Sequence, residues 1–207
     1  MKKTPYNPAD YTVPSFDTFP EFLTGITELY GQRPALSWFT RRKEEQTLTY
    51  AQLAEKVSAL RKAILAKQLP KGSHIAILSE NTADWIIAFL ATVSCGHVAV
   101  CADTEQSDGI IREMLCRSKT RLVFLSGTFL SICLPLLDSN DVSSMVLMDG
   151  KATDERVELL SSLYEEGAQL PESEPVQVSP DLTAEIVFTS GTTSQSKMVM
   201  LSQKAIM

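Results

Sequence analysis

Short apolar segments of strand length alternate with helical segments along most of the chain. The strand-like segments include 74–79, 98–101, 122–125 and 145–148, each a run of mainly aliphatic residues. Between them, apolar residues recur every three or four positions, as they do on one face of a helix. This alternation favours an α/β fold in which a mostly parallel sheet carries helices on both faces. Ligands of such sheets bind at the carboxyl ends of the strands, so that edge is where a functional site is expected.

Capping residues mark where several of the helices begin and end. Thr49 and Gln52 have the spacing of a capping box, and Thr82 precedes an apolar helical pattern that stops at Gly96. The spacing of apolar residues also predicts a helix over 154–166 that ends at Gly167. We therefore expect a regular succession of strand and helix up to residue 168.

The order of these segments divides the chain into four parts. We expect a lead segment with one helix over 1–34, an α/β core over 35–168, a proline-marked linker over 169–184 and a strand-loop-strand unit over 185–201.

The strand-loop-strand unit is the stretch that points most directly to chemistry. Ile186 to Phe188 and Met198 to Leu201 predict two strands, and the loop between them carries six Ser or Thr hydroxyls around Gly191 and closes at Lys197. Small residues let backbone N–H groups approach an oxyanion, hydroxyls donate hydrogen bonds, and an ammonium group offsets negative charge. The loop therefore suits a polyphosphate. The alternative interpretation is an ordinary Ser/Thr-rich surface hairpin.

The spacing of the loop distinguishes two kinds of phosphate-binding motif. A Walker A loop has the form G-x-x-x-x-G-K-[ST] and opens a helix. Here Ser196 and Met198 stand where that pattern requires glycine and a hydroxyl, and the residues after Lys197 predict a strand. The stretch from Phe188 to Val199 instead resembles the signature loop of the adenylate-forming superfamily, [YF]-T-S-G-[ST]-T-G-x-P-K-G-V. That superfamily comprises acyl-CoA synthetases, luciferases and peptide-synthetase adenylation domains.

Three residues depart from this signature, and two weaker stretches support it. Ser194, Ser196 and Met198 stand where the family has Gly, Pro and Gly. Glycine adopts positive φ freely and serine does not, so the departures predict weaker phosphate binding. They also motivate an alternative, a degenerate, non-catalytic module that keeps the AMP-binding fold for interaction. Residues 48–53 and 90–103 are similar to two other, less specific stretches of the family.

The resemblance implies that the chain is the amino-terminal portion of an AMP-binding (adenylation) domain. The parent enzyme is then expected to activate a carboxylic acid, for example a fatty acid, with ATP and Mg²⁺ as an acyl-adenylate. It is expected to pass the acyl group to CoA or an acyl carrier. The loop would bind the β- and γ-phosphates through the cofactor-binding residues Thr189, Ser190, Gly191, Thr192, Thr193, Ser194 and Lys197.

The resemblance also implies that much of the family's machinery lies outside this sequence. Nothing in the 207 residues corresponds to the family's later adenine-binding, ribose-binding and magnesium-binding motifs, or to its C-terminal domain with the catalytic lysine. The remaining carboxyl-terminal part of the parent protein is therefore an expected partner. No catalytic residue and no metal ligand is assigned, and the isolated chain is expected to be inactive.

Charge and composition exclude several other classes of protein. The formal net charge is −6, and ten of the 25 acidic side chains lie within 149–185, which disfavours nucleic acid as a partner. The most apolar window, 85–100, is too short for a transmembrane segment, and the first twenty residues lack the apolar region of a signal peptide. The four cysteines form no C-x-x-C pair, which indicates buried free thiols and a cytoplasmic location rather than a zinc site.

Overall fold

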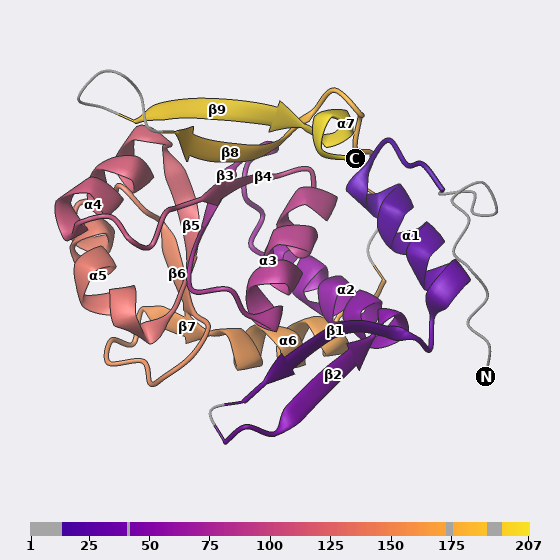
Figure 1. The fold of residues 1–207 in the computed structure, drawn as a ribbon. Coiled ribbons are helices and arrows are strands. Elements are labelled where there is room, and N and C mark those ends of the chain that lie inside the picture. The colour runs from indigo at the N-terminus through magenta and orange to yellow at the C-terminus, as the bar shows by residue number, and fades with distance from the viewer. Residues whose placement is uncertain (1–13, 41, 173–175, 190–195) are drawn as a thin grey trace.

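A seven-stranded sheet forms the centre of the protein (Figure 1). The computed structural model describes residues 14–40, 42–172, 176–189 and 196–207. In spatial order the strands are β7 (Val157–Leu159), β6 (Ser144–Leu147), β5 (Thr120–Leu125), β3 (His74–Leu78), β4 (Val98–Cys101), β8 (Thr183–Thr189) and β9 (Lys197–Ser202). Every neighbouring pair is parallel except β8 and β9, which are antiparallel.

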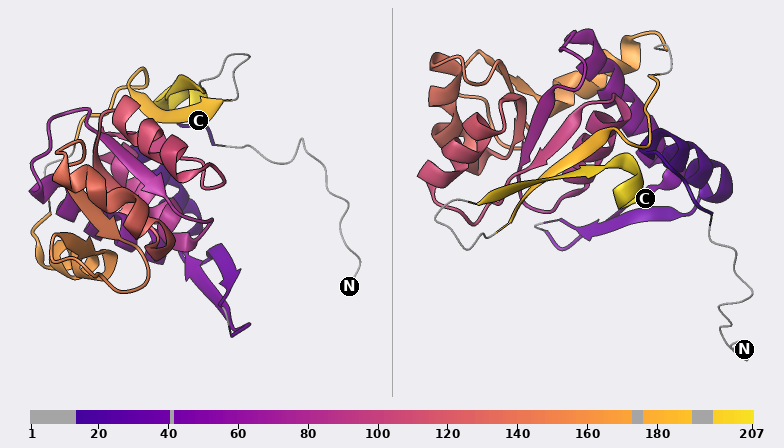
Figure 2. Two further views of the ribbon diagram at one scale, coloured as in Figure 1. Left: turned by 90° about the vertical axis from the view of Figure 1, so that its left-hand side faces the viewer. Right: turned by 90° about the horizontal axis from the view of Figure 1, so that it is seen from above.

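Helices cover both faces of this sheet, as the two turned views in Figure 2 show. They are α1 (Phe19–Tyr30), α2 (Tyr50–Ala66), α3 (Ala83–Ser94), α4 (Asp108–Arg117), α5 (Leu130–Asp138), α6 (Leu160–Gln169) and α7 (Gln203–Ile206), with a short 3-10 turn, Gly127–Phe129, before α5. A separate hairpin of β1 (Pro34–Phe39) and β2 (Glu45–Thr49) lies beside α2. The expected α/β fold with a mostly parallel sheet is confirmed.

The central strand β3 explains why the core splits into two apolar layers. Ile75 and Ile77 point to the layer formed with α1, α2, α3 and α6, whereas Ala76 and Leu78 point to the layer formed with α4 and α5. All four side chains are 0% exposed, because both faces of the strand are covered. A strand buried on both faces reads as a continuous apolar run, which is the pattern that the sequence shows here.

Local capping interactions fix the helix starts that the sequence predicts. At the start of α2, Thr49 Oγ1 accepts from the Gln52 amide at 3.2 Å and Gln52 Oε1 accepts from the Thr49 amide at 2.9 Å. At the start of α3, Thr82 Oγ1 accepts from the Trp85 amide at 3.1 Å. Gly96 has φ +70°, a left-handed conformation that favours glycine, and it ends the turn between α3 and β4.

The helix predicted over 154–166 is wrong in its start and its end. Residues Val157–Leu159 form β7, which pairs in parallel with β6, and the helix that follows runs over Leu160–Gln169. Edge pairing of Val157 with Met145 outweighs the helical spacing of the leucines. Gly167 does not end the helix either. It lies inside α6, where a Cβ atom would stand 1.9 Å from the Ala59 carbonyl oxygen, so the missing side chain lets α6 contact the backbone of α2.

The expectation of four buried thiols holds for only part of the set. All four cysteines are free, and Cys95 and Cys133 are buried. Burial raises the pKa of both of these thiols to about 12. Cys101 is half-buried, and Cys116 is exposed near the end of α4.

Among the described residues, no helix is long and apolar enough to cross a membrane.

Replacing Gly167 with alanine is expected to destabilise the protein. The new methyl group would overlap the Ala59 backbone, so α6 must move away from α2 at a cost of about 1–3 kcal/mol or more. Urea unfolding followed by circular dichroism measures the change. Gly109→Ala is the matched control, because Gly109 lies in α4 with nothing within 4 Å of the added methyl. That control should be neutral or should stabilise by up to about 1 kcal/mol. Equal effects of the two changes would contradict the close contact.

The cysteines are expected to divide into one reactive thiol and three protected ones. Cys116 is exposed, although partial burial and then the nearby Asp141 charge raise its pKa. Iodoacetamide at a pH of about 8.5 should therefore alkylate roughly one thiol per folded chain, identified by peptide mass spectrometry. All four should react after denaturation in guanidinium chloride. Fast labelling of Cys95 or Cys133 in the folded protein would contradict this packing.

Candidate phosphate-binding hairpin

The β8–β9 hairpin holds the two described ends of the predicted phosphate loop. Thr189 is the last residue of β8, and in the antiparallel register it lies directly opposite Lys197, the first residue of β9. Both side chains are exposed. Residues opposite one another on antiparallel strands point to the same face, with Cβ atoms about 5 Å apart. The structure therefore places the Thr189 hydroxyl and the Lys197 ammonium group on one face of the hairpin. The other predicted site residues, Ser190, Gly191, Thr192, Thr193 and Ser194, lie outside the described residues.

Packing of the hairpin on the core determines which face these two side chains occupy. Phe188 and Met198 oppose one another one step inside the hairpin, and both pack on the apolar layer beneath α4 and α5. Because side chains alternate along a strand, Thr189 and Lys197 project from the other face. Met198 stands where the family signature has a glycine. Its side chain is accommodated by this core contact.

The element that follows Lys197 separates the two possible phosphate motifs. Lys197 begins a strand that runs to Ser202, whereas the lysine of a Walker A loop lies at the start of a helix. The first helix after Lys197 is the four-residue α7, which begins at Gln203 beyond the strand. The Walker A interpretation is therefore excluded by the fold of the hairpin.

The electrostatic surroundings leave the Lys197 ammonium group available to an anion. Within the described part of the chain, no carboxylate lies within ion-pair distance of it.

A carboxylate, that of Asp103, lies at the same edge of the sheet. Asp103 follows β4, the parallel neighbour of β8, so it leaves the sheet at the same edge as Thr189. Its carboxylate accepts from Gln106 Nε2 at 2.7 Å and from the Glu105 amide at 2.9 Å. These two bonds hold the pKa of the Asp103 carboxyl below its usual range, so it stays ionised.

One residue that supports the hairpin gives no signal in the sequence. Arg117, at the end of α4, donates from Nη2 to the Ser196 carbonyl oxygen at 3.0 Å, and its Nη1 lies 3.3 Å from Glu113 Oε1. The bond fixes the residue immediately before β9, next to Lys197. It joins residues 79 positions apart, and local sequence patterns do not reach over such a separation.

Among the residues with described structure, no group of three or more His, Cys, Asp or Glu side chains could hold a metal ion.

Comparison with known proteins gives consistent matches along the chain. A family model described as AMP-binding enzyme matches residues 26–207. A putative acyl–CoA ligase of Bacillus subtilis, YdaB, is 28% identical over 162 residues, which cover 78% of this chain and 32% of that protein. The hybrid PKS-NRPS synthetase iliA of Neonectria sp. is 31% identical over 157 residues, which cover 76% of this chain and 4% of that protein.

A solved structure shares the same fold. The anthranilate CoA ligase AuaEII in complex with anthranoyl-AMP superposes with a TM-score of 0.78 at 17% sequence identity, covering 96% of this chain and 37% of that one. The chain spans about a third of the length of the curated CoA ligases that it matches.

Replacing Arg117 with glutamine is expected to loosen the stem of the hairpin. The change removes the charged donor to the Ser196 carbonyl and should cost about 1 kcal/mol of unfolding free energy. It should also shift the amide NMR signals of Lys197 and Thr189. Glu113→Gln is the matched control, because it removes only the helical ion pair, worth about 0.3–0.5 kcal/mol, and keeps the bond to Ser196. Identical spectra for the two variants would show that Arg117 does not support the hairpin.

Proposed function

Because the chain belongs to the family of AMP-binding enzymes, we propose that its parent protein is an acid–thiol ligase that activates a carboxylic acid with ATP. In the first step a carboxylate oxygen attacks the α-phosphorus of ATP, which gives an acyl-adenylate and releases pyrophosphate. In the second step the thiol of CoA attacks the acyl carbon, which gives the thioester and releases AMP. The observation that carries the proposal is the hydroxyl-and-ammonium pair of Thr189 and Lys197 at the carboxyl edge of the sheet.

In this proposal the hairpin loop of residues 189–197 binds the β- and γ-phosphates of ATP. The Thr189 hydroxyl donates a hydrogen bond to a phosphate oxygen, and the Lys197 ammonium group offsets the charge of the departing pyrophosphate. Ser190, Thr192, Thr193 and Ser194 add hydroxyl donors, and Gly191 admits the phosphate close to the backbone. The loop thereby contributes positioning and electrostatic stabilisation. Mg²⁺ bound with ATP would supply further neutralisation of phosphate charge.

CoA is the acceptor that we propose, with an acyl carrier protein as the alternative. The Bacillus subtilis relative is a putative acyl–CoA ligase, and the anthranilate enzyme that shares the fold is a CoA ligase. The relative from Neonectria is a hybrid PKS-NRPS synthetase, which keeps the carrier alternative open. We propose a cytoplasmic location, where free thiols such as Cys95 and Cys133 stay reduced.

Trapping of the acyl-adenylate tests the proposal. The protein expressed from its full open reading frame, incubated with ATP, Mg²⁺, hydroxylamine and a panel of carboxylic acids, is expected to form an acyl-hydroxamate with at least one acid. Lys197→Gln should lower the rate about tenfold to a hundredfold, because a charged group at the leaving phosphates is lost. Lys204→Gln is the matched control, since Lys204 is an exposed lysine of α7 beyond the hairpin.

The outcomes separate the enzyme from the degenerate module suggested by Ser194, Ser196 and Met198. Hydroxamate formation that depends on Lys197 and not on Lys204 supports the ligase. No hydroxamate with any acid would favour a non-catalytic module that keeps the fold for interaction. The 207-residue chain alone is expected not to exchange pyrophosphate into ATP, and measured exchange by it would refute that part of the proposal.

A further inference from the structure

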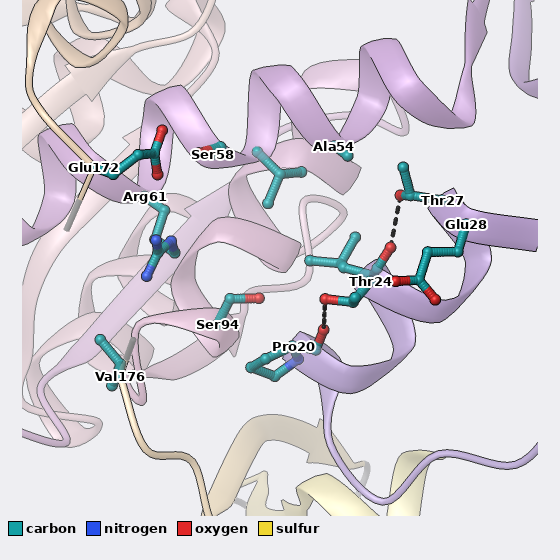
Figure 3. A pocket seen from close by; sticks show the side chains of 12 residues that line it. Pro20, Thr24, Thr27, Glu28, Ala54, Ser58, Arg61, Ser94, Glu172 and Val176 are labelled. Carbon is teal, nitrogen blue, oxygen red and sulfur yellow. Dashed lines mark hydrogen bonds between the residues drawn. The ribbon is translucent and has the colours of Figure 1, made fainter. Parts of the chain in front are cut away.

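A pocket of about 560 Å³ opens between α1 and α2 (Figure 3). Its walls come from these two helices, from the end of α3 and from the residues that follow α6. Sites for small molecules typically have volumes of about 300–1,000 Å³, so the pocket is large enough for an organic ligand. None of the described residues that line it belongs to the β8–β9 hairpin.

The surface of the pocket is mostly apolar, although seven of the twelve described residues that line it carry a polar or charged side chain. Pro20 and Leu23 of α1 face Val57 of α2, and Val176 adds a further apolar side chain. These residues would contact the hydrocarbon part of a ligand. A mostly apolar surface that also carries hydrogen-bonding groups is common in small-molecule sites.

Two polar groups in the pocket lack partners within the described part of the chain. The Arg61 guanidinium, which extends from α2 in Figure 3, makes no side-chain hydrogen bond or ion pair there. Ser94, at the end of α3, is 4% exposed, and its Oγ has no hydrogen-bond partner there. A buried hydroxyl without a partner is costly, and a ligand oxygen would supply the missing bond.

We propose that this pocket binds an organic monocarboxylate with an apolar body, its carboxylate held by Arg61 and Ser94. A guanidinium group matches the two oxygens of a carboxylate, and the apolar walls match an aliphatic or aromatic body. Two carboxylates stand at the rim, Glu28 and Glu172, and Glu172 is already paired with Lys62 at 3.4 Å. Their negative charge disfavours a dianionic phosphate, so a single negative charge is the better fit.

This pocket is distinct from the proposed phosphate loop. Ser94 lies just before the start of β4, whereas Thr189 lies at the end of β8, which runs parallel to β4. Seven residues of β8 span roughly 20 Å, more than the length of a small acid. The acid bound here is therefore a second carboxylate, separate from the one that the proposed reaction activates at the other end of the strand.

An NMR titration of the 207-residue protein with sodium octanoate tests the inference. We expect saturable shifts of the amides of Val57, Arg61 and Ser94, with a Kd at or below about 1 mM. Octanol, which has the same chain and no charge, should bind at least about tenfold more weakly, because it loses the charged hydrogen bonds to Arg61. Octylammonium should bind more weakly still.

Matched variants identify the groups that hold the ligand. Arg61→Gln should weaken octanoate binding about tenfold, whereas Arg112→Gln, which removes the same charge from α4 on the other face of the sheet, should leave it unchanged. Ala54→Leu should block the pocket from the α2 side and abolish binding.

Three results would overturn the inference. They are equal binding of octanoate and octanol, shifts confined to residues beside Thr189 and Lys197, and no saturation up to about 10 mM octanoate. The comparison of octanoate with octanol uses the unaltered protein, so it decides the matter even if a variant fails to fold. None of these results depends on whether the full-length protein forms an acyl-hydroxamate.

Discussion

The parallel pairing of β8 with β4 is the interaction on which the candidate site depends. Ala99 to Cys101 pair with Glu185 to Val187, so a strand of only four residues anchors the hairpin to the rest of the sheet. Backbone hydrogen bonds set this register, and with it the edge at which Thr189 leaves the sheet. Gly96 favours this arrangement, because its φ of +70° turns the chain into β4 in a conformation that other residues rarely adopt. A Cβ atom there would meet Val176 Cγ1 at 3.6 Å and Leu182 Cδ2 at 3.8 Å, which are ordinary contact distances, so the backbone conformation is what calls for glycine.

The hairpin is then fixed by interactions of three kinds. Phe188 and Met198 pack on the apolar layer beneath α4, and Arg117 donates to the Ser196 carbonyl. The third is the hydrogen bonding of β9 to β8 over six residue pairs. The same packing explains how a methionine replaces the glycine of the family signature without disrupting the strand. Met198 lies on the face of the hairpin opposite Thr189 and Lys197, so the departure from glycine falls away from the face that carries these two residues.

Features that local sequence encodes were predicted well, and features that depend on distant contacts were not. The capping box at Thr49 and the buried run at 75–78 were readable because the residues that make them are adjacent in sequence. The helical spacing over 154–166 misplaces the helix, because pairing with β6 makes Val157 part of a strand. Local sequence also indicates a helix end at Gly167, because the contact that requires glycine there is with the backbone of Ala59 in α2, more than 100 residues earlier. Of the candidate site, the sequence predicts the loop hydroxyls and Lys197, and among these residues the structure describes Thr189 and Lys197. It could not identify Arg117, which acts across the fold.

Most of the acidic charge of residues 149–185 lies away from the end of the hairpin that carries Lys197. Glu185 of β8, and Asp103 after the neighbouring strand β4, are acids on the near side of the sheet. Several acids of residues 149–185 lie around β7 and α6 and are paired there, Glu158 with Lys67 at 2.6 Å and Asp154 with Arg156 at 2.6 Å. β7 and β9 are the two outer strands of the seven-stranded sheet, so roughly 29 Å of sheet separates them at about 4.8 Å per strand. At physiological ionic strength the field of an exposed charge is largely screened beyond about 8 Å. A polyphosphate at Lys197 would therefore respond to the groups beside it and only weakly to the acids around β7 and α6.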